Sequence, residues 1–200
     1  MKKSNSKSKA QSAFKKLGAV ALITATLAMF FTACNQTGGG KQKAPFVEGG
    51  ASLILSPDKL NIKVKAVTAD GSAITVEGCN ETTLASNTET TLTATGTTVI
   101  LKGKITELDV SGAYGNKQPL IALNVQGLIY LQTLGCEYNQ LTELNVRGLT
   151  SLQTLFCGSN QLTSLNVQDL TALQRLYCPG NQLNAQAMTK LLKGLPVRAA

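Results

Sequence analysis

The chain has 200 residues, enough for one ordinary domain with tails or for two small units. Its formal charge of +8 is concentrated at the start, because six of the 19 basic residues fall in the first sixteen positions and residues 34–200 carry only +2. This distribution is typical of an export signal and gives no indication of nucleic-acid binding. The sequence contains no His and no Trp, so the commonest metal ligand and general base is missing.

Residues 1–33 have the pattern of a secretory signal peptide. Basic residues precede an apolar run of about fifteen residues, which is short for a membrane span, and Ala33 stands before Cys34. The Thr-Ala-Cys ending resembles the bacterial lipobox, although Phe31 stands where that motif usually has Leu. The resemblance implies that Cys34 is lipidated and becomes the mature N-terminus. The alternatives are a plain signal peptide with an incidental Cys, or an uncleaved anchor.

Residues 34–50 are predicted to be a flexible tether. Residues 38–40 are three consecutive glycines, and residues 35–43 contain no apolar side chain. A tether after a lipidated Cys would let a surface module stand away from the bilayer. Several acyl chains, at ~0.8 kcal/mol per buried methylene, anchor a protein durably without a spanning helix.

Residues 51–103 are predicted to be a small β unit that caps the segment after it. Apolar and polar residues alternate over 60–67, an Asp-Gly turn signal follows, and residues 74–76 are another β-branched run. This pattern predicts a hairpin. Residues 82–98 are rich in Thr, which favours strands over helices because its branched side chain is stiff. A further predicted strand, at 98–101, leads into the repeats.

Internal repetition is the strongest signal in the sequence. The segment LQTLGCEYNQL at 131–141 recurs as LQTLFCGSNQL at 152–162 and as LQRLYCPGNQL at 173–183, in steps of 21 residues. The shared pattern LxxLxCxxNxL resembles the defining segment of leucine-rich repeats, and a 21-residue unit with two similar halves resembles their short bacterial class. The resemblance implies a mainly β fold: a short solenoid of parallel strands over residues 104–183, with an N-terminal β cap and a C-terminal helix.

One unit of this series is irregular. Residues 120–125 match a second half in the expected place, but residues 105–110 lie fifteen positions before them, so they could be either half of a damaged coil. We interpret 105–110 as a first half that is followed by an insertion at 112–119.

Stacked coils explain the spacing of the apolar residues. Those predicted to point inward in the first clean coil are Leu131, Leu134, Cys136, Leu141, Leu144 and Val146. At ~1.5–3 kcal/mol per buried large side chain, one coil cannot offset the entropy of ordering its chain, so coils need neighbours. Equivalent strands then stack in parallel, about 4.8 Å apart.

Two further columns follow from the same register. Asn139, Asn160 and Asn181 fall where the chain leaves each strand, so stacked amides can satisfy backbone groups in the turns. The cysteines of the pattern are Cys136, Cys157 and Cys178. With one per coil and no His, they indicate small apolar core residues rather than a metal or redox site. Cys79 has no assigned role.

Residues 184–200 are predicted to form a helical cap. Asn184 can cap the helix, and a Gly-x-Pro sequence ends it. Its expected apolar face consists of Ala187, Met188, Leu191 and Leu192.

The outward positions of the coil strands are the predicted binding face. The predicted partner contacts are Phe156, Tyr177, Arg175, Thr133, Thr154 and Glu137, with Gly135, Gly158 and Pro179 in the same columns. Phe156 and Tyr177 share a column beside Arg175, which is typical of interface anchors. The alternative is an aromatic pair that only stiffens the sheet. Glu143 and Ser164, in the second halves, are not expected to bind.

Taken together, the lipobox, Thr-rich middle, Asn-Gln-Leu-Thr coils and terminal helix resemble surface leucine-rich-repeat lipoproteins of host-associated anaerobes, including spirochaetes. The resemblance implies an exported protein, lipid-anchored at the cell surface or outer membrane, that attaches to a host or bacterial protein. The alternative is an envelope or periplasmic lipoprotein without a host ligand. The sequence contains no nucleophile–base pair, phosphate loop or metal motif, so we expect no enzyme, no cofactor, no nucleic-acid partner and no small-molecule substrate.

Overall fold

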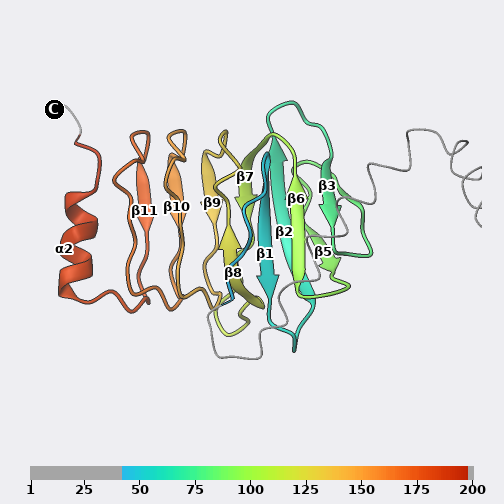
Figure 1. The fold of residues 1–200 in the computed structure, drawn as a ribbon, viewed down its shortest axis with the longest axis horizontal. Coiled ribbons are helices and arrows are strands. Elements are labelled where there is room, and N and C mark those ends of the chain that lie inside the picture. The colour runs from blue at the N-terminus through green and yellow to red at the C-terminus, as the bar shows by residue number, and fades with distance from the viewer. Residues whose placement is uncertain (1–41, 198–200) are drawn as a thin grey trace, which may run out of the picture. The chain divides into compact units, whose positions relative to one another are not determined.

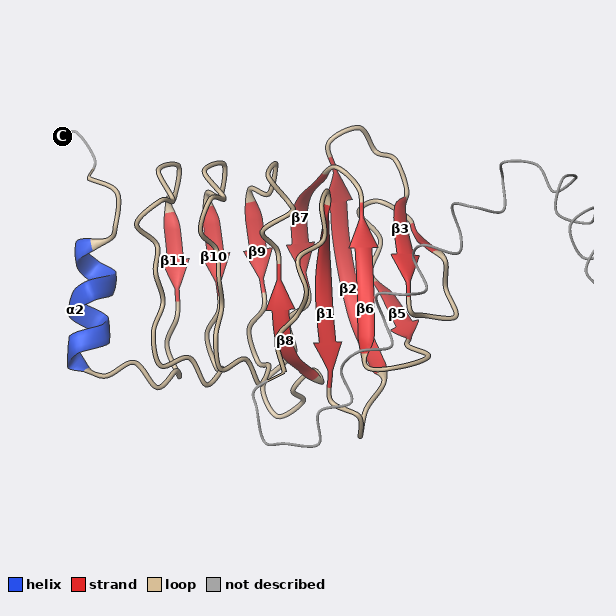
Figure 2. Ribbon diagram, viewed as in Figure 1, coloured by secondary structure: helices blue, strands red, loops and turns tan. Residues whose placement is uncertain are grey.

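The computed structural model describes residues 42–197. The predictions for the signal peptide, for lipidated Cys34 and for most of the tether concern residues outside this range. Within it, the fold is mainly β, with two sheets and a helix, α2, near the C-terminal end (Figures 1 and 2). The predicted mainly β class with a C-terminal helix is thus confirmed. No helix in the described range is long and apolar enough to cross a membrane.

The first sheet has five strands in the order β4-β3-β6-β1-β8, and neighbouring strands are antiparallel. Its members are β1 (Gly50–Leu55), β3 (Ile74–Glu77), β4 (Thr83–Leu84), β6 (Thr98–Lys102) and β8 (Leu120–Asn124). All of β1 is buried. It is paired on both edges, and the hydroxyl of Ser52 donates to the carbonyl of Pro45, which brings the preceding segment against the strand.

The second sheet has six strands in the order β11-β10-β9-β7-β2-β5. Its members are β2 (Asn61–Thr68), β5 (Thr90–Thr93), β7 (Ile105–Asp109), β9 (Thr133–Gly135), β10 (Thr154–Phe156) and β11 (Arg175–Tyr177). β5, β2 and β7 pair antiparallel, whereas β7, β9, β10 and β11 pair in parallel. The Thr-rich segment therefore forms strands, as predicted.

The predicted hairpin between residues 60–67 and 74–76 is wrong, although both strands exist. β2 belongs to the six-stranded sheet and β3 to the five-stranded sheet, so the chain changes sheets at the Asp-Gly turn. This connection is held by Thr68 Oγ1, which donates to the carbonyl of Ser72 at 2.7 Å, and by Ser72 N, which donates to Asp70 Oδ1 at 3.0 Å. The alternation of apolar and polar residues determines which face of each strand is buried, but not which strand is its neighbour. Two strands in facing sheets can bury their apolar faces as well as two strands of a hairpin can.

β7 determines the alignment of the irregular first unit. Leu108 pairs in parallel with Leu134, so residues 105–110 align with the first halves of the later units, which confirms that interpretation. The two leucines are 26 positions apart instead of 21, and the excess lies in the insertion at 112–119. On its other edge β7 pairs antiparallel with β2. It therefore joins the antiparallel and parallel parts of the sheet.

A single hydrophobic cluster draws residues from both sheets and from the repeat units. β2 contributes Ile62, Val64 and Ala66, which are at most 1% exposed and alternate with exposed polar residues. The six inward residues predicted for the first clean unit are all buried, the most exposed being Leu144 at 7%. The segments predicted at 51–103 and 104–183 thus share one core.

Helix α2 (Ala185–Lys193) begins where the sequence predicts, with the side chain of Asn184 capping its first turn. Fewer of its apolar side chains pack against the core than expected. Of the four apolar residues on the predicted face only Leu191 is buried, whereas Met188 is 38% and Leu192 59% exposed. The prediction that these two residues pack inward is wrong, because the helix contacts the core chiefly through Leu191, which is 2% exposed.

Candidate binding faces

The predicted asparagine ladder is present. Asn160 is 5% exposed, and its Nδ2 donates to the carbonyls of Cys136 and Cys157 at 2.9 and 3.2 Å. Its Oδ1 accepts from Leu141 N at 3.0 Å. Asn181 makes the equivalent contacts one unit later. Each amide therefore ties the turn of its own unit to the preceding unit and satisfies buried backbone groups.

Asn139, the first member of the ladder, differs at one atom. Its Nδ2 donates to the carbonyls of Val110 and Cys136 at 2.9 and 3.1 Å. Its Oδ1 is buried and has no hydrogen-bond partner within residues 42–197. The side-chain oxygens of Asn160 and Asn181 each accept from the backbone N–H of the residue 19 positions earlier. For Asn139 that residue is Leu120, which is paired with β1 in the other sheet. The irregular first unit thus leaves the ladder incomplete at its start.

The cysteines of the repeat units occupy the predicted inward column, with one correction. Cys136 and Cys157 are buried, whereas Cys178 is only half-buried because it follows β11, the last strand of the sheet. Burial raises the pKa of Cys136 well above its usual range and raises that of Cys157 to about 12. Burial, followed by the charge of Glu81, raises the pKa of Cys79 to about 11. Such thiols are poor nucleophiles, which fits core packing.

The predicted outward residues form two columns on the six-stranded sheet. One contains Thr133, Thr154 and Arg175, and the other contains Gly135, Phe156 and Tyr177. Exposure rises toward the last strand, since Phe156 is half-buried, Arg175 is exposed and Tyr177 is 53% exposed. This face is therefore most open at β11.

Two glycines let neighbouring side chains lie close against the backbone of this face. A Cβ on Gly135 would come within 2.7 Å of Asp109 Oδ1, and one on Gly158 within 3.3 Å of Glu137 Oε1 and Tyr177 Cε1. Tyr177 therefore rests against the preceding unit while the rest of its surface faces solvent. Burial, followed by the charge of Asp109, raises the pKa of Glu137.

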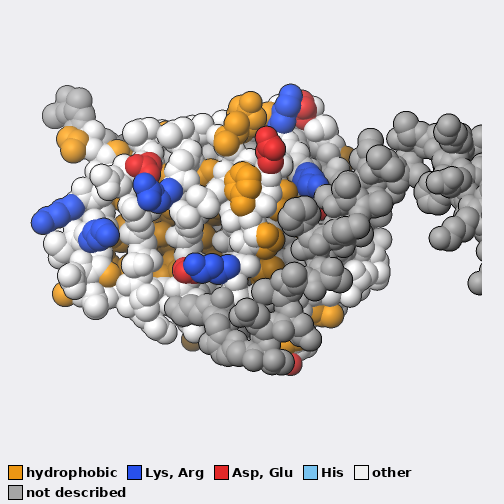
Figure 3. Space-filling view, viewed as in Figure 1, with side chains coloured by type: hydrophobic (Ala, Val, Ile, Leu, Met, Phe, Trp, Pro, Cys, Tyr) orange, Lys and Arg blue, Asp and Glu red, His pale blue; other side chains and the backbone are white. Residues whose placement is uncertain are grey.

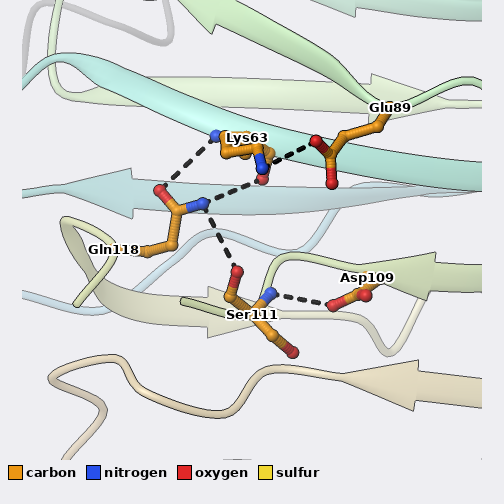
Figure 4. Close-up of polar contacts among 5 residues, drawn as sticks. All are labelled: Lys63, Glu89, Asp109, Ser111 and Gln118. Carbon is orange, nitrogen blue, oxygen red and sulfur yellow. Dashed lines mark hydrogen bonds and ion pairs between the residues drawn. The ribbon is translucent and has the colours of Figure 1, made fainter. Parts of the chain in front are cut away.

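Gln118 connects this face to the antiparallel strands (Figure 4). It is 6% exposed, and its side-chain amide bonds both the N–H and the C=O of Lys63, at 3.4 and 3.5 Å, much as a strand's peptide group would. Its Nε2 also donates to the carbonyl of Ser111 at 3.4 Å, and Ser111 N donates to Asp109 Oδ1 at 2.9 Å. The Lys63 ammonium pairs with Glu89 at 2.6 Å. Sequence reasoning missed Gln118, because it lies in an insertion without a motif.

No family model, curated protein or solved structure matches this chain. Among residues 42–197, no group of three or more His, Cys, Asp or Glu side chains could hold a metal ion.

Charged side chains lie scattered rather than gathered on the face shown in Figure 3. Two further ion pairs are Lys102 with Glu77 at 2.7 Å and Arg147 with Asp169 at 3.2 Å. Exposed pairs of this kind contribute little to stability.

The predicted tether is too long at its C-terminal end. The carbonyl of Ala44 accepts from Asn124 Nδ2 at 3.2 Å. The carbonyl oxygen of Val47 lies so close to Gly127 that a Cβ there would be 1.8 Å from it. Residues 44–47 therefore lie against the second half of the first unit, held by an amide and by a close backbone approach that residue composition does not reveal.

A groove of about 460 Å³ lies beside this segment. Most of its lining repeats every 21 residues, in columns of Ala122, Glu143 and Ser164, of Asn124, Asn145 and Asn166, and of Gln126 and Arg147. Glu143 and Ser164 are not expected from the sequence to bind, yet both line this groove. The outward residues of the second halves recur as regularly as those of the first halves, and that periodicity could have revealed the groove.

A second cavity, of about 560 Å³, is lined in part by Phe46, Ile129 and Tyr130. Their exposed fractions are 62%, 58% and 54%. None of these residues belongs to the predicted outward columns. Tyr130 therefore matches Tyr177 in exposure while lying elsewhere on the molecule.

Proposed function

We propose that this chain is a surface-anchored protein-binding module whose residues 104–183 form a short leucine-rich-repeat solenoid. The 21-residue pattern, the buried leucine and cysteine columns and the amide contacts between successive units all support this architecture. In the proposal, residues 51–103 serve as the N-terminal cap and residues 184–200 as the C-terminal cap, because an end coil would otherwise expose apolar surface.

The observation that carries the binding role is the outward surface at β11. Arg175 and Tyr177 are exposed two positions apart on one strand, and Phe156 lies beside Tyr177 on the next. Aromatic and Arg side chains are the residues that most often dominate protein interfaces. Thr133, Thr154 and Glu137 would provide the surrounding polar contacts.

The proposed partner is a protein of a host or of another bacterium. Lipidation of Cys34, proposed from the lipobox resemblance, would hold the module at the cell surface. Neither an enzyme activity nor a cofactor is part of this proposal.

The binding role is tested by capture followed by substitution. Full-length protein on beads is exposed to host extracellular matrix and to neighbouring bacteria, and the captured protein is identified. Tyr177→Ala and Phe156→Ala should each weaken its binding at least about thirtyfold, the loss that corresponds to an anchor worth over ~2 kcal/mol. Tyr130→Ala, equally exposed at 54% but elsewhere, should leave binding unchanged. Normal binding by both column variants would assign the aromatic pair a structural role.

The location is tested separately on intact cells. Added protease should degrade the protein without lysis, whereas a protected protein would favour a periplasmic or envelope role. Cys34→Ala should accumulate as an unprocessed precursor that no longer enters the detergent phase. If mature protein still partitions into detergent, the anchor is not Cys34.

A further inference from the structure

The groove beside residues 44–47 lies on the other side of the core from the predicted binding face. Asn124 ends β8 of the five-stranded sheet, and it bridges in parallel to Asn145 of the next unit. Asn166 lies a further 21 residues along the chain and also lines the groove. The second halves of three successive units thus present one asparagine each to the same groove.

All three asparagines use their side-chain oxygen in the same way. Oδ1 of Asn124, Asn145 and Asn166 accepts from the backbone N–H two residues later, at 3.0, 3.1 and 3.1 Å. This local turn orients the amide and leaves the Nδ2 group as the outward donor. The repeat therefore builds a row of equivalent hydrogen-bond donors along the groove.

Only the first donor of the row has a partner among the described residues. Asn124 Nδ2 donates to the carbonyl of Ala44 at 3.2 Å, and Asn124 is half-buried beneath that segment. Asn145 and Asn166 are exposed, and no described residue accepts from their Nδ2 groups. The chain thus shows at its first unit how this row receives a peptide carbonyl.

The glycines beside the row show the same contrast. A Cβ on Gly127 would meet the carbonyl of Val47 at 1.8 Å, so the backbone of the bound segment passes directly over this residue. Gly148 occupies the same place one unit later, and a Cβ there would meet nothing within 4 Å. No described atom lies against Gly148 as the carbonyl of Val47 lies against Gly127.

We propose that Asn145 and Asn166 bind the backbone of an extended peptide segment of a partner protein, as Asn124 binds the carbonyl of Ala44. The bound segment of this chain has the sequence Lys43-Ala44-Pro45, and Lys43 lines the groove together with Glu143. The ligand class is therefore an extended peptide with small residues or Pro at the contact and a basic residue beside it. A Pro in the peptide favours binding because it holds the free peptide extended, which lowers the conformational entropy lost on binding.

The direct test is nuclear magnetic resonance of the full-length chain in detergent. The probe is a blocked synthetic peptide with the sequence of residues 42–47, QKAPFV. On addition to millimolar concentration, the side-chain amide signals of Asn145 and Asn166 should shift and saturate, while that of Asn181 in the buried ladder should not. If the two groove signals stay unshifted, the proposal is overturned, whether the groove is inert or is already filled by this chain's own N-terminal residues.

Substitutions can remove the Nδ2 donor of each asparagine while keeping the side-chain oxygen that forms the local turn. Asn145→Asp and Asn166→Asp keep the oxygen that accepts from the backbone but remove the NH₂ donor, so each should weaken peptide binding about fivefold, as for the loss of one hydrogen bond. Equal affinity in the double variant, with an unchanged melting temperature, would contradict the proposal. Should the double variant unfold, the amide shifts in the unsubstituted chain still decide the question.

The two proposed binding faces can fail independently. Phe156→Ala and Tyr177→Ala should leave binding of the QKAPFV peptide unchanged, because they lie on the other sheet. A peptide affinity that falls with these variants would place its site on the aromatic column and overturn the groove proposal.

Discussion

The antiparallel strands of residues 50–102 and the parallel strands of residues 133–177 bury their apolar residues in one core but find their partners differently. In the antiparallel part, β1 pairs with β6 and β8, distant in sequence, while β2 and β3, joined by a tight turn, do not pair at all. In the parallel part each strand pairs with the one 21 residues away. A repeated unit specifies its own neighbour, whereas alternation specifies only the buried face of a strand.

β7 is where these two modes of pairing meet. It is antiparallel to β2 on one edge and parallel to β9 on the other. If the shared core is continuous across β7, a destabilising substitution in β7 should lower the stability of both parts together.

The largest effect is expected at Leu108, which is 1% exposed in the middle of β7. Leu108→Ala should lower the free energy of unfolding by about 2–5 kcal/mol, since it removes a large side chain from a packed core. Amide hydrogen exchange in increasing urea should show the backbone of β2, in the antiparallel part, and that of β10, in the parallel part, losing protection at the same denaturant concentration. Leu176→Ala, at a half-buried position, is the control and should cost less. Loss of protection in β10 while β2 stays protected would mean that the two parts unfold separately.

The asparagine ladder belongs only to the parallel part. Asn160→Ala should cost about 1–3 kcal/mol in unfolding free energy, because the carbonyls and the Leu141 N–H that it satisfies would stay buried without partners. Gln161→Ala, one residue later, keeps its backbone bond to Leu141 and should cost less than about 0.5 kcal/mol. Equal costs in chemical denaturation would contradict the ladder.

The contrast between the repeated parallel strands and the non-repeated antiparallel strands determines how much could be predicted from the sequence. The 21-residue period predicted the inward leucines, the buried amides and the outward columns, because each position is repeated and its neighbours are known. The sheet change between β2 and β3 could not be predicted, since either arrangement buries Ile62 and Ile74 equally well. Gln118 and the docking of Ala44 depend on single side-chain contacts that no periodic pattern records.

Thiol reactivity should fall from the end of the stack toward its interior. Cys178 follows β11, the last strand of its sheet, and is half-buried, whereas Cys157 and Cys136 are buried. Alkylation of native protein should label Cys178 at least about tenfold faster than the other two, which react only when the chain opens locally. All three should react once the protein is unfolded, as mass spectrometry can verify. Faster labelling of Cys136 than of Cys178 would contradict the order of the strands.

The smallest effect is expected at Glu137, whose pKa is raised by burial and by the charge of Asp109. Because the folded state favours the protonated carboxyl, its contribution is fully present below the unfolded pKa and is lost as pH rises through the folded pKa. Glu137→Gln should therefore stabilise the protein at pH 7 by less than about 0.5 kcal/mol, since the group is only partly buried and solvent screens its charge. The gain should vanish below about pH 4, where the unfolded carboxyl is also protonated. Thermal melts of both proteins across this range measure the difference, and a gain that grows toward low pH would contradict this assignment.

Every proposed binding surface depends on the register that places Leu155 between Leu134 and Leu176. Nuclear Overhauser effects between leucine methyl groups test this register directly in solution. We predict cross-peaks from Leu155 to both Leu134 and Leu176 in methyl-labelled protein. Cross-peaks from Leu155 to neither residue would show that the units do not stack at a 21-residue spacing, and the outward columns and the asparagine row would then not exist.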